Sequence, residues 1–131
     1  MLERLEQLER NVIELENFKS KNELEEIKKN LQLQWIMRYG LFESIQIVID
    51  ISCHLVTKYN LGNPKTYGDC VEFLKQEKYL NTTISDKLLG MIGLRNILIH
   101  EYIEINVEKL YDLLNHLADF KTFANEVKDI I

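Results

Sequence analysis

Apolar residues recur at three- and four-residue steps along most of the chain, a spacing typical of helices packed in a bundle. The first stretch places them at Leu5, Leu8, Val12 and Leu15. Alternation of apolar and polar residues is confined to the short stretch from Tyr102 to Ile105, which is interpreted as a connector. One proline and five glycines in 131 residues leave little room for long irregular segments. The pattern predicts an all-α fold, and the length fits a single domain, residues 1–131, with one core.

Capping signals divide the chain into about five predicted helices. Ser20 and Glu23 match the Ser-x-x-Glu capping box, which predicts a second helix running to the turn at residues 60–64. That helix would have about 38 residues and span nearly 60 Å, so we expect it to bend or to project towards another subunit. Three further signals predict the starts of the remaining helices: Thr66 with Asp69, Thr83 with Asp86, and Asn106. The expected architecture is a mostly antiparallel bundle with one long second helix.

The charge of the chain restricts how it could bind nucleic acid. A formal net charge of −5 argues against binding through bulk positive charge, so any RNA contact must come from a local cluster or a partner. The N-terminus is charged from Glu3 onward, which argues against a signal peptide. No apolar run approaches the length needed to span a bilayer. We therefore expect a soluble, cytoplasmic protein with no membrane partner.

The residues that commonly bind metals lack metal-site spacing. Cys53 and Cys70 form neither a CxxC pair nor a zinc-finger pattern, and they are expected to be reduced, half-buried thiols. The three histidines show no ligand spacing such as HExxH. Neither a metal site nor a cofactor is expected.

One segment of the predicted fourth helix concentrates side chains suited to chemistry: Arg95, His100 and Tyr102. Arginine is a permanent cation that pairs well with phosphate, and histidine exchanges protons near neutral pH. RNA carries its own 2′-hydroxyl nucleophile, so these two groups suffice to break its backbone without a metal. On an ideal helix His100 would lie about 140° around the axis from Arg95. Either the helix ends near His100, or the two groups meet through a second subunit.

Each of these side chains also has a structural interpretation. Arg95 could form an ion pair with an acid on the long helix. His100 could cap the end of its own helix, where the helix dipole favours a cation. Tyr102 could be an ordinary packed tyrosine with a solvated hydroxyl.

A second polar pattern lies on the long helix, where Gln46, Asp50 and His54 recur every four residues. It could be a solvated face. Alternatively, it could line a cleft beneath the motif, with Asp50 orienting Arg95 or His100.

The motif resembles that of the HEPN superfamily: an arginine, four residues, a histidine, one residue and a tyrosine, at the end of the fourth helix of an all-α domain. The run at residues 43–51 and the turn at residues 64–67 are similar to its HepT branch, the toxins of bacterial and archaeal HepT–MntA toxin–antitoxin pairs. Asn96 also fits the pattern after the arginine. The resemblance extends over nearly the whole chain.

This resemblance implies a homodimer whose two motifs face each other across the twofold axis and which cleaves RNA without a metal. Arg95 and His100 would be the catalytic pair, supported by Asn96, and the polar pattern on the long helix adds Asp50 as a second supporting residue. The partner would be an MntA-like antitoxin, a minimal nucleotidyltransferase that can transfer AMP to Tyr102. The alternative is a non-catalytic HEPN adaptor module in which the same residues bind a nucleotide or a partner.

Overall fold

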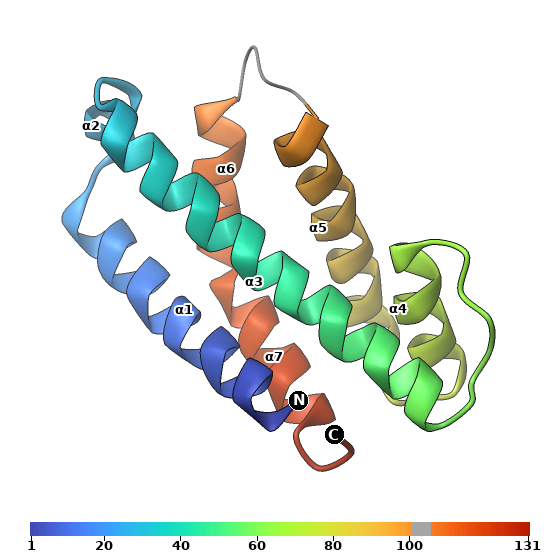
Figure 1. Ribbon diagram of the computed structural model, residues 1–131. Helices are drawn as coiled ribbons and strands as arrows, with labels where there is room; N and C mark the ends of the chain where they lie inside the picture. Colours follow the sequence, from blue (N-terminus) through green and yellow to red (C-terminus); the bar gives the residue numbers. More distant parts are fainter. Residues whose placement is uncertain (101–105) are drawn as a thin grey trace.

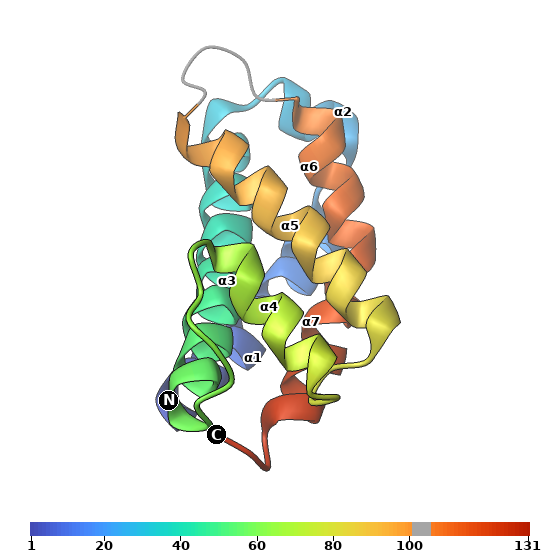
Figure 2. The ribbon, with the colours of Figure 1, turned by 90° about the vertical axis from the view of Figure 1, so that its right-hand side faces the viewer.

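The computed structural model describes residues 1–98 in full, the backbone of residues 99 and 100, and residues 106–131. All regular elements in this part of the chain are helical, which confirms the all-α prediction. They are α1 (Leu2–Lys21), α2 (Leu24–Lys28), α3 (Leu31–Lys58), α4 (Tyr67–Gln76), α5 (Thr82–His100), α6 (Val107–Leu113), the 3-10 turn η1 (Leu114–His116) and α7 (Leu117–Val127). In Figure 1, α3 crosses the molecule diagonally between α1 on one side and α4 and α5 on the other. Figure 2 shows α4 and α5 together on one face, and both views show the two termini at the same end.

The long helix α3 forms the centre of the bundle and packs against each of the other described α-helices. Its buried residues therefore point in several directions: Met37, Leu41, Ser44, Ile45, Ile47, Val48, Ile49, Ile51, Ser52, Leu55 and Val56. By length and composition α3 is long and apolar enough to cross a membrane, which the expectation from the sequence did not identify. That expectation considered unbroken apolar runs, whereas α3 interrupts its apolar residues with single polar ones. More than half of its most apolar window is buried inside the bundle, as in the core helix of a globular protein.

Two predicted helix starts are confirmed. The Thr66 side chain accepts a hydrogen bond from the Asp69 backbone N–H, and the Asp69 carboxylate accepts from the Thr66 backbone N–H, which completes the capping box of α4. These backbone donors lower the pKa of Asp69, the largest effect coming from Lys65 N–H. Asn106 caps α6 by accepting from Lys109 N–H. Such caps satisfy backbone donors that lack partners within the helix.

The other two predicted starts were wrong. Ser20 lies inside α1, where its hydroxyl donates to the Asn17 carbonyl, and the helix ends only at Lys21. The predicted 38-residue helix is instead the single turn α2 followed by the 28-residue α3, whose cap is Asn30. In the same way α5 begins at Thr82, and the Asn81 side chain, rather than Thr83, accepts from Ile84 N–H.

The last predicted helix, which starts after Asn106, is not continuous in the structure. The 3-10 turn η1 separates α6 from α7 and tightens the helix at Leu114–His116. Leu110 before this turn, Leu114 within it, and Leu117 and Phe120 after it are all buried.

Cys53 and Cys70 form a disulfide, so the expectation of reduced thiols was wrong. Their Cα atoms are 5.0 Å apart because α4 folds back against α3 after the Pro64 turn. The bond joins residues 17 positions apart in the chain and fastens α4 to the core helix.

The helices α1 and α3 approach each other closely at Gly40. A Cβ atom added to Gly40 would lie 2.8 Å from Leu15 Cδ2, closer than real Cβ contacts come. Leu15 is itself buried, so its side chain has little room to move aside. The absence of a side chain at Gly40 therefore sets the distance between these two helices.

We predict that Thr66→Ala lowers the free energy of unfolding by about 1 kcal/mol, because the N–H of Asp69 loses its acceptor. The matched control is Thr83→Ala, which removes an exposed threonine inside the first turn of α5. Since alanine is the better helix former, the control should leave stability unchanged or slightly raised. Urea unfolding followed by circular dichroism measures both variants. Equal stabilities would show that the α4 capping box contributes nothing.

Candidate functional site

Arg95 lies on α5 and is held over α3 by contacts on several sides. Its Nε and Nη2 donate to the Gln46 side-chain carbonyl oxygen at 3.1 and 2.7 Å. Its Nη1 donates to the side-chain oxygen of Asn96 at 3.1 Å. The guanidinium carbon lies 5.2 Å from the ring centroid of Tyr67 and 5.6 Å from that of Phe42. Two aromatic faces and two amides thus fix the position of this cation.

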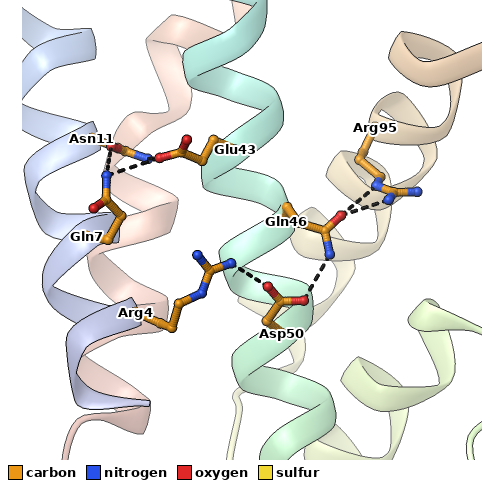
Figure 3. A network of polar contacts seen from close by, with 7 residues as sticks. All are labelled: Arg4, Gln7, Asn11, Glu43, Gln46, Asp50 and Arg95. Carbon is orange, nitrogen blue, oxygen red and sulfur yellow. Dashed lines mark hydrogen bonds and ion pairs between the residues drawn. The ribbon is translucent and has the colours of Figure 1, made fainter.

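Gln46 is itself oriented by a chain of polar contacts that reaches α1 (Figure 3). Its amide nitrogen donates to Asp50 Oδ1 at 2.9 Å, which leaves its oxygen facing Arg95. The other Asp50 oxygen is ion-paired with Arg4. Asp50 therefore acts on Arg95 through Gln46 and makes no direct hydrogen bond or ion pair with it among the described residues.

The direct partners of Arg95 are neutral amides, which differs from the structural ion pair considered for it. Within the residues that the structure describes, no carboxylate forms a salt bridge with Arg95. Three of its five N–H groups are used by Gln46 and Asn96, and one remains on each terminal nitrogen. The site thus holds a positioned cation whose described partners are all neutral, an arrangement suited to binding an anion.

A second polar cluster supports the same face of α3. Gln7 and Asn11 of α1 each donate to the Glu43 carboxylate, at 3.1 and 3.0 Å (Figure 3). The hydroxyl of Tyr39 and then the amide of Asn11 lower the pKa of Glu43, and partial burial opposes them. The stabilisation is therefore present at neutral pH and is lost as the pH falls through the lowered pKa. Together with Arg4–Asp50, this cluster fastens α1 along α3.

The end of α5 is tied to α3 by Arg38, whose Nη2 donates to the Leu98 carbonyl at 3.3 Å. Carbonyls in the last turn of a helix lack partners within the helix, so a cation suits them. The side chain of His100 and the whole of Tyr102 lie outside the described residues, and their predicted roles stay predictions.

Some residues of this site could be identified from the sequence, and others could not. Gln46 and Asp50 belong to a network of hydrogen bonds and an ion pair that also includes Arg4 and Arg95, so they do not form a solvated face. No described contact joins His54 to this network. Arg4 was missed because nothing in the sequence relates it to Arg95. Tyr67 was noted only as part of a turn. Its place directly after the capping residue Thr66 was the one sequence signal that could have identified it as a residue of the site. Among the described residues, no group of three or more His, Cys, Asp or Glu could hold a metal ion.

Comparisons with known proteins agree on one family. A protein-family model described as ribonuclease HepT-like matches residues 1–127. The chain is 32% identical over 104 residues to the mRNA nuclease HepT of Shewanella oneidensis (strain ATCC 700550 / MR-1), an alignment that covers 79% of this chain and 78% of that protein.

Solved structures show the same fold. One is the tri-AMPylated HEPN toxin of Shewanella oneidensis in complex with an MNT antitoxin, with a TM-score of 0.89, 26% identity, and coverage of 98% of this chain and 96% of that one. Another is YutE from Bacillus subtilis, described as a cytosolic protein of unknown function, with a TM-score of 0.75, 16% identity, and coverage of 95% and 87%. At that identity YutE is evidence for the fold alone.

We predict that Gln46→Leu releases the Arg95 side chain. The Arg95 Nε–H should then exchange with water about tenfold faster or more, since hydrogen bonds to a charged group contribute about 1.5–3 kcal/mol. Asp50→Ala should also speed this exchange, but by less. Gln46 is still present in that variant, and only the hydrogen bond that orients its amide is lost. The control is Gln34→Leu, whose side chain bonds to backbone carbonyls of α2. Nitrogen-15 NMR of the arginine Nε–H signals measures the exchange, and an unchanged Arg95 signal in Gln46→Leu would contradict the prediction.

Proposed function

Because the chain belongs to the HepT-like ribonuclease family, we propose that it is a metal-independent endoribonuclease that acts as the toxin of a toxin–antitoxin pair. The relative at 32% identity is named an mRNA nuclease, and one structural relative is a HEPN toxin in complex with an MNT antitoxin. The observation that carries the proposal is Arg95, a cation that is positioned by neutral amides among the described residues and is suited to binding phosphate. A protein that cleaves mRNA works in the cytoplasm, the location expected from the sequence.

Cleavage of RNA needs proton transfers and stabilisation of charge. We assign to Arg95 the stabilisation of the extra negative charge on the five-coordinate phosphate, and to Asn96 the support of its guanidinium. We assign to His100 the removal of the proton from the 2′-hydroxyl or its donation to the leaving 5′-oxygen. With one such histidine in each motif, the second proton-transfer group would come from a second subunit.

We predict that Arg95→Ala and His100→Ala each lower the rate of RNA cleavage by about 10²–10⁴, with EDTA present throughout. The matched controls are Arg10→Ala and His116→Ala, which remove exposed residues of the same types outside the site. Cleavage is followed on a labelled RNA under single-turnover conditions.

Two outcomes would contradict this assignment. Arg95→Ala cleaving as fast as the wild type would remove Arg95 from the mechanism. RNA left intact by a folded wild-type protein would favour the non-catalytic adaptor.

We further propose that the active form is a homodimer, supported by an exposed apolar surface on α3. This surface, the α3 patch, consists of residues that are each more than half exposed: Leu31, Trp35, Ile36 and Tyr39. Exposed apolar patches of this kind mark protein contact sites. A shallow cavity of about 430 Å³ continues the α3 patch from Trp35 to Phe42, the residue beneath Arg95. A second copy bound there would bring its own Arg95 towards this one.

We predict that Ile36→Asp weakens the dimer at least about tenfold, because a carboxylate would be buried in an apolar interface. Ile13→Asp on α1 is the matched control, since Ile13 is exposed to the same extent (56% against 54%) on a different face. Analytical ultracentrifugation over a concentration series measures both variants. A wild type that stays monomeric, or equal weakening by both variants, would exclude the α3 patch as the interface.

For the partner we propose a minimal nucleotidyltransferase antitoxin that transfers AMP to Tyr102. The support is the similarity to a toxin that was solved both AMPylated and in complex with an MNT antitoxin. An AMP group on Tyr102 would bring an anion that competes with RNA for Arg95.

We predict that co-expression with an MNT-type nucleotidyltransferase antitoxin cognate to this chain adds the mass of AMP to the wild type and to Tyr111→Phe, but not to Tyr102→Phe. Intact-protein mass spectrometry measures all three. AMP on Tyr102→Phe, or none on the wild type, would remove Tyr102 as the acceptor.

A further inference from the structure

A cavity of about 710 Å³ opens beside Arg95, between α3, the turn that leads into α4, and α5. Its wall includes Lys65 and Tyr67 from the turn and the start of α4, and Ile92, Gly93 and Asn96 from α5. The volume lies within the range of about 300–1,000 Å³ that is typical of small-molecule sites. None of the roles proposed for Arg95, His100 and Tyr102 involves this cavity.

The lining of the cavity suits a flat ring with polar edges. Ile92 and the Cys53–Cys70 disulfide give it an apolar floor. Tyr67 contributes an aromatic ring that is 47% exposed. Lys65 and Asn96 add a cation and an amide at the edge. The Asn96 oxygen accepts from Arg95, and among the described residues its NH₂ group donates to no partner and could donate to a ligand.

The cavity is continuous with the cation of the site through two residues. Tyr67 lines the cavity and also lies 5.2 Å from the guanidinium of Arg95. Asn96 lines the cavity and also binds that guanidinium. A ligand with an anion on Arg95 and a ring in the cavity would therefore span adjoining subsites, and a nucleotide has both parts.

We propose that this cavity binds the base of the RNA nucleotide next to the phosphate held by Arg95, with the base stacked on Tyr67. The proposal rests on the proposed ribonuclease function and assigns a base-binding subsite to it. Proteins commonly recognise single-stranded RNA by stacking its bases on aromatic side chains. Stacking on Tyr67 would accept any base, so base preference would come from Lys65 and Asn96 at the edge of the cavity.

Two glycines of α5 provide a matched test. A Cβ atom added at Gly93 or at Gly90 meets no atom within 4 Å. Gly93 lines the cavity, whereas Gly90 lines a separate hollow of about 210 Å³ beside Lys87 and His116. Gly93→Leu would fill the base subsite, and Gly90→Leu would add the same side chain elsewhere on the helix. Both changes raise helix propensity equally, so their effects on α5 itself cancel.

The probes are the four nucleoside 3′-monophosphates and inorganic phosphate, titrated by NMR. We expect the wild type to bind at least one nucleotide more tightly than phosphate, and Gly93→Leu to weaken that binding about tenfold or more. Gly90→Leu should leave it unchanged, and phosphate binding should be equal in all three proteins. Nucleotides that bind no more tightly than phosphate, or equally well to Gly93→Leu, would overturn the proposal. If Gly93→Leu does not fold, nucleotide binding is compared between Tyr67→Ala and Tyr67→Phe. Only phenylalanine keeps the stacking surface, so Tyr67→Ala should lose the advantage of nucleotides over phosphate and Tyr67→Phe should keep it.

Cleavage assays separate this proposal from the one on which it rests. If the wild type cuts RNA and Gly93→Leu cuts it at the same rate with the same base preference, the subsite is wrong and the nuclease stands. If the wild type cuts no RNA but nucleotide binding still depends on Gly93, the nuclease is wrong and the nucleotide site stands.

Discussion

The packing of α3 against every other described α-helix is the constraint on which the structure depends. No residue of α3 from 41 to 56 is exposed, so this part of the helix has few positions where a polar side chain can lie without cost. Glu43, Gln46 and Asp50 occupy such positions, and each is hydrogen-bonded to α1, to α5 or to a neighbour on α3. The same packing that forms the core thus brings α1 and α5 into contact with one row of polar side chains on α3.

The use of an amide at Gln46 has an electrostatic consequence. A carboxylate in contact with Arg95 would attract it with about 4 kcal/mol at 4 Å in the effective dielectric near a protein surface. An RNA phosphate would have to compete with that attraction. Gln46 instead positions the guanidinium with a dipole and leaves its net charge intact. The carboxylate, Asp50, lies one residue away and is paired with Arg4.

Features that depend on neighbouring residues could be predicted from the sequence, and features that depend on packing could not. The caps at Thr66 and Asn106 are set by residues three positions away. The Ser20–Glu23 pattern failed because α1 remains helical to Lys21, and the Asn30 cap was missed because it has Leu33 where a capping box has an acid. The disulfide and the contact of Arg4 with Asp50 join distant parts of the chain, and their spacing carries no signal. For the site, Gln46 and Asp50 could be found by their periodicity, whereas their order of contact with Arg95 required the structure.

Gly40 links the tilt of one helix to the chemistry of another. The contacts of Leu15 with Gly40, of Gln7 with Glu43 and of Arg4 with Asp50 show that α1 and α3 run antiparallel. The spacing of α1 and α3 also sets the reach of Arg4 to Asp50, and Asp50 orients the Gln46 amide whose oxygen faces the guanidinium. A methyl group at Gly40 would press on the Leu15 side chain, and any shift of α1 that relieved this contact would be passed along to that amide. Residues with no access to RNA would in this way set the electrostatic potential that a phosphate encounters.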